Sequence, residues 1–312
     1  MNAYRAYEQT LDGGLKQVCL ANADCQLAIL PAAGFNLYSA IYKNRQLLMP
    51  TVNIANPMSA AGVPILFPMP NRTRDCQYTF GGHSCQIKKN GQPRFLHGLF
   101  MDEPFNYSFG ADETSAWCKG WASISSDKEY FDSYPFPCTL TLLYTLSKDG
   151  LKLEYTVQND GNETLPYGFA IHPYFDKMGQ PDKIRIQVPA PSYYEAEMCM
   201  PTGKLLPAQN ETDISEFKAV ADLNLDHVFS GMSGKKACIA YDELGFGLEL
   251  SASKEFVNMV VYTPQNRPGF CLENQTNATD FLNLYAKGID TAFMNTVEPG
   301  QTASGWIEIK VV

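Results

Sequence analysis

The sequence predicts an all-β protein built as a large antiparallel β-sandwich. Apolar and polar residues alternate with a period of two through most of the chain, and clusters of Gly, Pro, Asn and Asp separate the alternating runs. No long stretch has the periodicity of an amphipathic helix. Many short strands separated by turns are typical of two sheets packed face to face. The βαβ rhythm and the Gly-x-Gly-x-x-Gly loop of parallel α/β folds are missing, which disfavours that class.

The clearest single element is a β-hairpin. Residues 139–146 alternate, Lys148-Asp149-Gly150 supplies a turn, and residues 151–157 alternate again. Similar short strands are predicted, in chain order, at residues 26–30, 37–42, 78–80, 184–188, 246–250, 256–262 and 306–311. The polar and irregular stretch 265–295 is instead predicted to be a long functional loop region.

Length and composition favour one globular unit. The 312 residues are 45% hydrophobic and 18% charged, so the chain has enough apolar area for a substantial core. No change in composition marks a linker and no internal repeat is present, so we predict a single domain over residues 1–312. Nine scattered cysteines, an odd number, show neither Cys-x-x-Cys pairs nor zinc-type spacing, and we expect reduced thiols that pack as small hydrophobes.

Charge and hydropathy exclude several classes of partner. The net charge is -9 and no basic run could follow a phosphate backbone, so we expect no nucleic-acid partner. The first residues hold no apolar stretch of signal-peptide length, and no apolar run elsewhere reaches the length of a membrane span. We therefore expect a soluble, cytoplasmic protein with no membrane contact.

Four residues are candidates for a catalytic or binding site: Arg72, His97, His172 and Glu273. Each lies within or next to an apolar segment, where a charge costs desolvation energy unless it is paired or used. Taken singly, each has an ordinary structural explanation as a loop ion pair, a turn-capping residue, a hydrogen-bonded core histidine or a surface carboxylate. Taken together, a carboxylate, two imidazoles and a guanidinium on a β scaffold can move protons and hold hydroxyl groups.

The order of these residues along the chain resembles the aldose 1-epimerase (galactose mutarotase) family, over nearly the whole chain. The resemblance rests on an ordered set of short motifs: Asn71-Arg72, His97-Gly98, His172-Pro173-Tyr174-Phe175, Asp226 within Leu225-Asp226-His227-Val228-Phe229, Glu273 within Cys271-Leu272-Glu273-Asn274-Gln275, and the ending Val297-Glu298-Pro299-Gly300-Gln301. The resemblance implies a β-supersandwich of the galactose mutarotase type.

The resemblance also implies an isomerase that interconverts the α and β anomers of a free aldose such as galactose or glucose. Glu273 would be the general base that takes the proton of the anomeric hydroxyl, and His172 the general acid that protonates the ring oxygen. Four further residues would bind the substrate: Asn71, Arg72, His97 and Asp226. We expect no cofactor and no metal, a monosaccharide as the partner, and a monomer or weak homodimer. The chemistry fits the residue types, since opening a hemiacetal needs one acid and one base.

Three alternatives remain open. A related branch acts on hexose 6-phosphates and carries an arginine shortly after the His-Gly pair, where this chain has Met101 and Asp102. Arg74 and Arg94 could still bind a phosphate, so a phosphorylated substrate remains an alternative. A sugar-binding β-sandwich without turnover would need no matched acid and base. A glycosidase would need two carboxylates, for which Asp226 with Glu273 is the pairing this chain offers.

A second departure concerns Pro173, which follows His172 where many galactose-type members have a hydroxyl residue. Proline restricts the backbone of the residue before it to extended geometry. We therefore expect a rigidly held imidazole in a slightly altered pose, with an effect on substrate preference.

Overall fold

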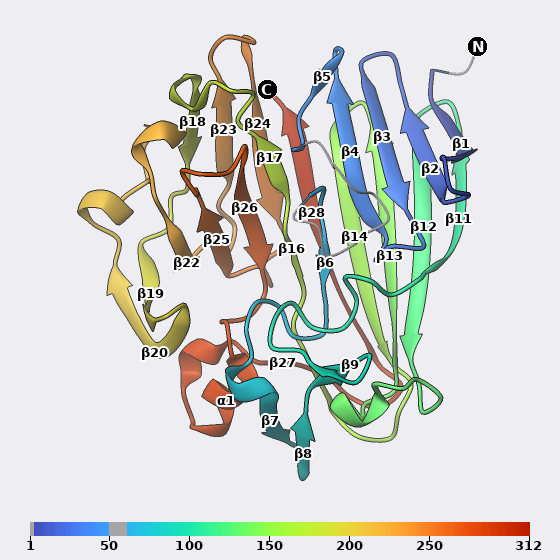
Figure 1. Cartoon of the computed structure of the whole chain (residues 1–312), viewed down its shortest axis with the longest axis vertical. Helices are drawn as coiled ribbons and strands as arrows, with labels where there is room; N and C mark the ends of the chain where they lie inside the picture. The colour runs from blue at the N-terminus through green and yellow to red at the C-terminus, as the bar shows by residue number, and fades with distance from the viewer. Residues whose placement is uncertain (1–2, 50–60) are drawn as a thin grey trace.

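The computed structural model describes residues 3–49 and 61–312, and most of the regular secondary structure in these residues is antiparallel strand (Figure 1). The all-β class predicted from the alternation is confirmed. Within the described residues there are three large sheets, where the sequence predicted two, because the N-terminal strands pair among themselves. Within the same residues, α1 (Phe281–Ala286) is the one α-helix, and no helix there is long and apolar enough to cross a bilayer.

The largest sheet of the described residues has nine strands and contains the predicted hairpin. Its strands, in spatial order, are β11 (Asn106–Ala111), β12 (Ser115–Ile124), β13 (Cys138–Ser147), β14 (Gly150–Asn159), β28 (Thr302–Val311), β24 (Phe246–Ala252), β23 (Ala237–Tyr241), β18 (Ile184–Gln187) and β21 (Lys218–Ala219). Buried and half-buried residues alternate along all of β13, as the period of two requires. The turn at Lys148 and Asp149 sets the register of β13 and β14, with Leu146 opposite Leu151.

A second sheet of the described residues has eight strands and carries the candidate site. Its strands are β20 (Met200–Pro207), β19 (Ser192–Glu197), β22 (Asp226–Ser230), β25 (Asn258–Tyr262), β26 (Gly269–Gln275), β16 (Ala170–Ile171) and β6 (Ile65–Leu66), with β17 (Tyr174–Asp176) also paired to β26. Every residue of β26 is buried. The strand is held on one side by β25 and on the other by β16 and β17, so it lies in the interior of the sheet.

The N-terminal strands form a five-stranded sheet of their own: β1 (Arg5–Thr10), β2 (Lys16–Ala21), β3 (Cys25–Leu30), β4 (Asn36–Tyr42) and β5 (Arg45–Gln46). This sheet packs against the nine-stranded one. The ring of Phe35 stacks on Tyr144 at 5.7 Å, and a side chain at Gly120 of β12 would lie 2.4 Å from the Phe35 ring. Buried apolar side chains from all three sheets belong to one continuous cluster.

The remaining elements are short. The two-stranded pairs are β7 (Gln77–Phe80) with β8 (His83–Gln86), β9 (Lys88–Lys89) with β10 (Gln92–Pro93), and β15 (Leu165–Tyr167) with β27 (Asn295–Val297). Single turns of 3-10 helix are η1 (Arg74–Cys76), η2 (Phe131–Ser133), η3 (Pro181–Lys183), η4 (Asn210–Thr212), η5 (Val220–Asp222) and η6 (Asp290–Ala292).

The prediction that residues 265–295 form a long loop is wrong. It contains β26, α1 and η6. The strand could not be recognised from alternation, because β26 ends in three consecutive polar residues that are all buried: Glu273, Asn274 and Gln275. The other predicted strands are confirmed, with ends shifted by a few residues: β25 begins two residues later than predicted and β28 begins four residues earlier.

Candidate active site

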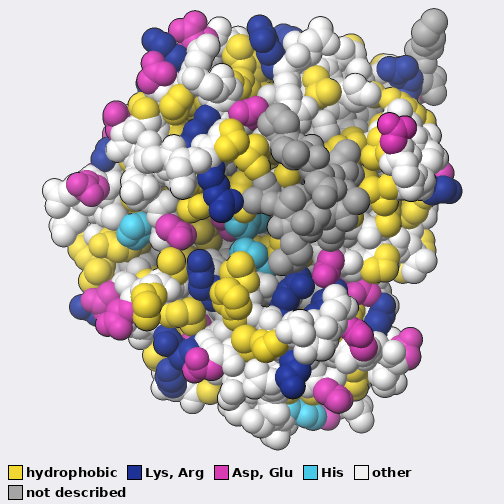
Figure 2. Space-filling model, viewed as in Figure 1, with side chains coloured by type: hydrophobic (Ala, Val, Ile, Leu, Met, Phe, Trp, Pro, Cys, Tyr) yellow, Lys and Arg dark blue, Asp and Glu magenta, His cyan; other side chains and the backbone are white. Residues whose placement is uncertain are grey.

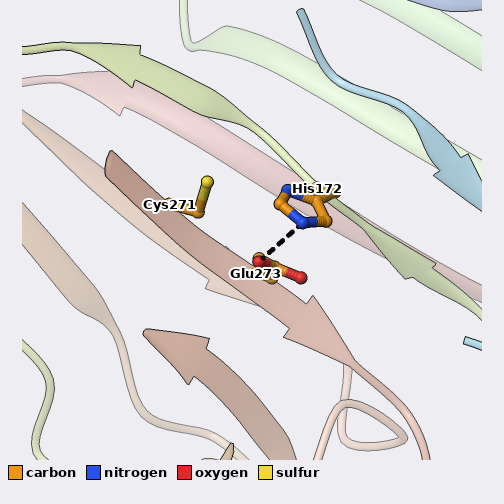
Figure 3. Close-up of side chains that lie close together, drawn as sticks. All are labelled: His172, Cys271 and Glu273. Carbon is orange, nitrogen blue, oxygen red and sulfur yellow. Dashed lines mark ion pairs between the residues drawn. The ribbon is translucent and has the colours of Figure 1, made fainter. Parts of the chain in front are cut away.

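His172 and Glu273 are brought together by the pairing of β26 with the strands on either side of His172. In this register Ala170 lies opposite Gln275 and Tyr174 lies opposite Cys271, which places His172 opposite Glu273. The backbone N–H of His172 donates to the carbonyl of Pro64, at the edge of β6. Nε2 of His172 lies 3.2 Å from Oε1 of Glu273 (Figure 3). Residues far apart in the sequence therefore form one polar pair.

Burial controls the protonation of this pair. Glu273 is 2% exposed, and burial raises its pKa well above the usual range, with Asp226 adding to the rise and Arg72 opposing it. Burial lowers the pKa of His172 to about 3, helped by the charges of Arg72 and Arg267. Both shifts favour the uncharged forms, a neutral carboxyl group and a neutral imidazole, which together hold a single proton. That proton can sit on the carboxyl group or cross the 3.2 Å contact to the imidazole.

The imidazole of His172 is fixed by neighbouring rings. The Tyr174 ring stacks on it at 4.5 Å with an interplanar angle of 14°, and the Tyr174 hydroxyl lies 3.4 Å from Nε2. The His97 ring meets it edge to face at 5.1 Å and 86°. Nδ1 of His172 is buried and has no hydrogen-bond partner among the described residues. The ring is thus positioned by packing, with Nε2 directed at the carboxyl group.

His97 occupies a strained turn that requires the glycine after it. His97 and Gly98 have φ values of +65° and +67°. A side chain at residue 98 would place its Cβ 2.5 Å from the carbonyl oxygen of Phe67, so only glycine fits. The His97 N–H donates to the carbonyl of Asn71 at 2.6 Å, which anchors the turn. Burial, followed by the nearby His172 and Arg72, holds the pKa of His97 well below its usual value, so this imidazole is neutral at neutral pH.

Asn71 and Arg72 form a polar edge next to the pair. Nη1 of Arg72 donates to Oδ1 of Asn71 at 3.0 Å, and the Arg72 backbone forms a bridge with Leu96, one residue before His97. The Arg72 guanidinium affects the pKa values of His97, His172 and Glu273 alike. The positive charge of Arg72 therefore lies close to both imidazoles and to the carboxyl group of Glu273.

Asp226, at the start of β22, lines a cavity of about 290 Å³ to which Asn71 and Arg72 also contribute, whereas His97, His172 and Glu273 are not among its lining residues. Asn71, Arg72 and Asp226 line the cavity together with residues of the β19–β20 hairpin, and the Cys199 thiol at the hairpin tip donates to Oδ2 of Asp226 at 3.4 Å. Figure 2 shows histidine side chains near the middle of the face drawn there, among basic and hydrophobic ones. A cavity of this size accommodates one small polar ligand.

The structure thus brings His97, His172 and Glu273 into contact and places Asn71, Arg72 and Asp226 around the adjoining cavity. Sequence reasoning assigned no part to two residues that lie beside the pair, Cys271 and Tyr174. Each lies two positions from a candidate residue, a spacing that points to the same side only in a strand, and residues 265–295 were predicted to be a loop.

Three of the described side chains could hold a metal ion. The nearest ligand atoms of His172, Cys271 and Glu273 all lie within 4.8 Å of one another, and all three residues are buried. Burial raises the pKa of the Cys271 thiol well above its usual value, with the Glu273 carboxylate adding to the rise. The spacing of the cysteines along the chain could not reveal this cluster, because its histidine comes from another strand.

Comparison with known proteins agrees with the geometry. A sequence model of the family named Aldose 1-epimerase matches residues 16–310. The uncharacterized protein YihR of Escherichia coli K12 is 24% identical over 288 residues, which cover 90% of each chain.

Solved structures share the fold. A galactose mutarotase-like protein from Clostridium acetobutylicum superposes with a TM-score of 0.90 at 19% identity, covering 99% of both chains. A galactose 1-epimerase from Lactobacillus acidophilus has a TM-score of 0.75 at 17% identity, covering 99% of this chain and 98% of that one. The predicted galactose mutarotase-like fold is confirmed.

Proposed function

The chain belongs to the aldose 1-epimerase family, and on that premise we propose that it interconverts the α and β anomers of a free aldose such as galactose or glucose. One observation carries the proposal: a buried acid and base, Glu273 and His172, lie 3.2 Å apart. The oxygens that must lose and gain a proton in this reaction, O1 and O5, are both bonded to C1. A donor and an acceptor this close together match that arrangement.

The reaction keeps the proton count of the pair constant. In the ion-pair form, the Glu273 carboxylate takes the proton of the O1 hydroxyl while the His172 imidazolium gives its Nε2 proton to O5. The C1–O5 bond breaks, and an open-chain aldehyde is left with Glu273 protonated and His172 neutral. The aldehyde group turns about C1–C2, and O5 attacks its other face as both protons return. General acid and general base catalysis each supply about 100- to 10,000-fold.

Burial favours the protonation state that ring opening produces. The raised pKa of Glu273 and the lowered pKa of His172 both stabilise the neutral carboxyl group and the neutral imidazole. Ring opening therefore moves the pair from its charged to its uncharged form in a site that disfavours charge. Because the pair prefers its uncharged form, the proton must cross from Glu273 to His172 before the next turnover. This transfer restores the charged form that begins the reaction.

Substrate binding is assigned to the polar residues around the pair. Arg72 and Asn71 would donate hydrogen bonds to ring hydroxyls, neutral His97 can both donate and accept, and Asp226 would accept from hydroxyls across the cavity. No part of this scheme needs a metal or an organic cofactor.

A phosphorylated sugar is less well supported than a free one. The two arginines that left this substrate open are engaged elsewhere: Arg74 pairs with Asp280 at 3.5 Å and Arg94 with Asp102 at 3.4 Å. Asp102 also accepts from Lys89 at 2.6 Å, so the position after the His-Gly pair is occupied by a buried ionic cluster. A phosphate would have to compete with these carboxylates for the same cations.

The test is polarimetry of freshly dissolved α-D-galactose, α-D-glucose, L-arabinose and glucose 6-phosphate with and without the purified protein. We expect faster equilibration of at least one free sugar and little effect on glucose 6-phosphate. A protein that binds these sugars without accelerating their equilibration would be a sugar-binding module, and the proposal would be wrong. Release of a free sugar from a glycoside would instead identify a glycosidase.

A further inference from the structure

Cys271 has no part in the proposed reaction, although it is fully buried beside the catalytic pair. It lies two residues before Glu273 on β26, so both side chains project from the same face of the strand (Figure 3). His172 reaches this face from the segment between β16 and β17, both of which pair with β26. A nitrogen, a sulfur and an oxygen ligand therefore converge from β26 and the segment beside it.

We propose that His172, Cys271 and Glu273 form a binding site for a thiophilic divalent cation such as zinc, and that occupation of this site switches the enzyme off. Imidazole, thiolate and carboxylate are the ligands that zinc takes in proteins. Three protein ligands leave the fourth position of a tetrahedral ion for water.

The geometry needs little adjustment. Zinc bonds of about 2.0 to 2.3 Å place tetrahedral ligand atoms about 3.3 to 3.7 Å apart. Nε2 of His172 and Oε1 of Glu273 are already 3.2 Å apart, and no separation among the three ligand atoms exceeds 4.8 Å. The sulfur must therefore approach by at most about 1.5 Å, which side-chain rotation can provide without movement of the backbone.

The charges also balance. A dication, a thiolate, a carboxylate and a neutral imidazole sum to zero, so a buried site can hold the ion without keeping a net charge out of water. Binding releases the thiol proton and the proton held by the His172–Glu273 pair. The metal then occupies the imidazole nitrogen and the carboxylate that would otherwise exchange protons with the sugar. This last step, inhibition, rests on the proposed function, whereas binding does not.

Binding is tested by titrating the purified full-length protein with Co²⁺, whose bond to a thiolate gives a charge-transfer absorption, and with Zn²⁺ in a calorimeter. We expect one ion per chain and a thiolate–cobalt band. Cys271→Ser should abolish the band and weaken binding more than about 100-fold, since loss of partners outside the coordination shell alone costs about 10- to 100-fold. His172→Gln, which keeps the thiol, should also weaken binding, and it replaces Cys271→Ser if that variant does not fold.

The matched control is Cys199→Ser. This thiol lies against Asp226 at the adjoining cavity, and it is the described thiol best placed to compete for the ion. The band should survive in Cys199→Ser. A band that persists in Cys271→Ser, a band that disappears in Cys199→Ser, or the absence of binding in the wild type would each overturn the site.

Inhibition is measured in the same polarimetric assay. Zinc should slow the protein-catalysed equilibration, a chelator should restore it, and a zinc blank without protein corrects for the free ion. A protein that shows the band but has no mutarotase activity would refute the proposed function and leave the metal site standing. An active protein that zinc neither binds nor inhibits would refute the metal site alone.

Discussion

Glu273 faces His172 across two paired strands, with 3.2 Å between Oε1 and Nε2, and both side chains are almost completely shielded from water. In this setting a carboxyl group and an imidazole are each more stable without charge. The pair can transfer a proton at little cost but holds a charge only at considerable cost. Changes to either residue should therefore affect the rate and the stability in opposite directions.

Glu273→Gln should lower kcat/KM by at least about 100-fold, because the amide cannot take a proton from the anomeric hydroxyl. The measurement is polarimetry on the sugar that the wild type equilibrates fastest. Glu154→Gln is the matched control, since that carboxylate is partly exposed on β14 and pairs with Lys152. A Glu273→Gln protein with the wild-type rate would remove Glu273 from the mechanism.

The same substitution should stabilise the protein at neutral pH. The folded state raises the pKa of Glu273, so the unfolded chain loses this proton above about pH 4.3 while the folded protein keeps it. The stability present below that pH is therefore lost as the pH rises toward the folded pKa. Urea unfolding at pH 5 and pH 8 should show Glu273→Gln gaining on the order of 1 kcal/mol or more at the higher pH. An equal difference at both values would contradict the raised pKa.

The pH profile of kcat/KM should be flat across the ordinary pKa of a histidine, about 6.5, because burial lowers the pKa of His172 well below that value. Addition of a second proton, with the pKa of His172 lowered to about 3, would produce the acid limb, and loss of the shared proton the alkaline limb. Both limbs belong to the coupled pair. An acid limb near pH 6.5, the ordinary pKa of a histidine, would show that His172 is not buried in the working enzyme.

Gly98→Ala should disrupt the turn that carries His97. Its control is Gly91→Ala, at φ +69° with no atom within 4 Å of the added Cβ, whereas Gly98 has φ +67° and the Phe67 carbonyl oxygen 2.5 Å away. Both variants bear the cost of positive φ, about 1 kcal/mol. Only Gly98→Ala adds the clash, so it should lose about 1 to 3 kcal/mol more in urea unfolding and also lose activity. Equal losses in the two variants would remove the clash as the reason for this glycine.

Asp226→Asn should raise KM more than it lowers kcat, because Asp226 is assigned to holding hydroxyls and not to moving protons. Asp222→Asn, an exposed carboxylate of η5 outside the cavity, is the control and should leave both constants unchanged. If Asp226→Asn lowered kcat as much as Glu273→Gln does, the result would instead favour the glycosidase hypothesis, in which both carboxylates take part in catalysis.

The all-β class and nine of the strands could be predicted from local patterns. The alternation in residues 139–157 predicts β13 and β14 because a strand with one buried face repeats every two residues. β26 could not be found in this way, since its polar residues are buried between neighbouring strands and look like loop residues in the sequence. In the N-terminal sheet only β3 and β4 are predicted from the alternation; β1, β2 and β5 are not, and the grouping of all five depends on pairings that composition does not encode.

The candidate site was less predictable. The pairing of His172 with Glu273 came from resemblance to a family, because nothing in either local sequence specifies the register between β26 and the strands beside it. Cys271 was overlooked for the same reason: its importance depends on a histidine supplied by another strand.

The backbone of β26 and the β19–β20 hairpin differ in how freely their positions can change. Its backbone is bonded to strands on both sides, so the proposed base cannot be moved without breaking the sheet. The β19–β20 hairpin lines the cavity that holds Asp226, and its outer strand, β20, is paired on one side only, with Met198 at the hairpin tip 96% exposed. Changes in this hairpin can therefore reshape the cavity while the backbone that carries the proposed base keeps its position.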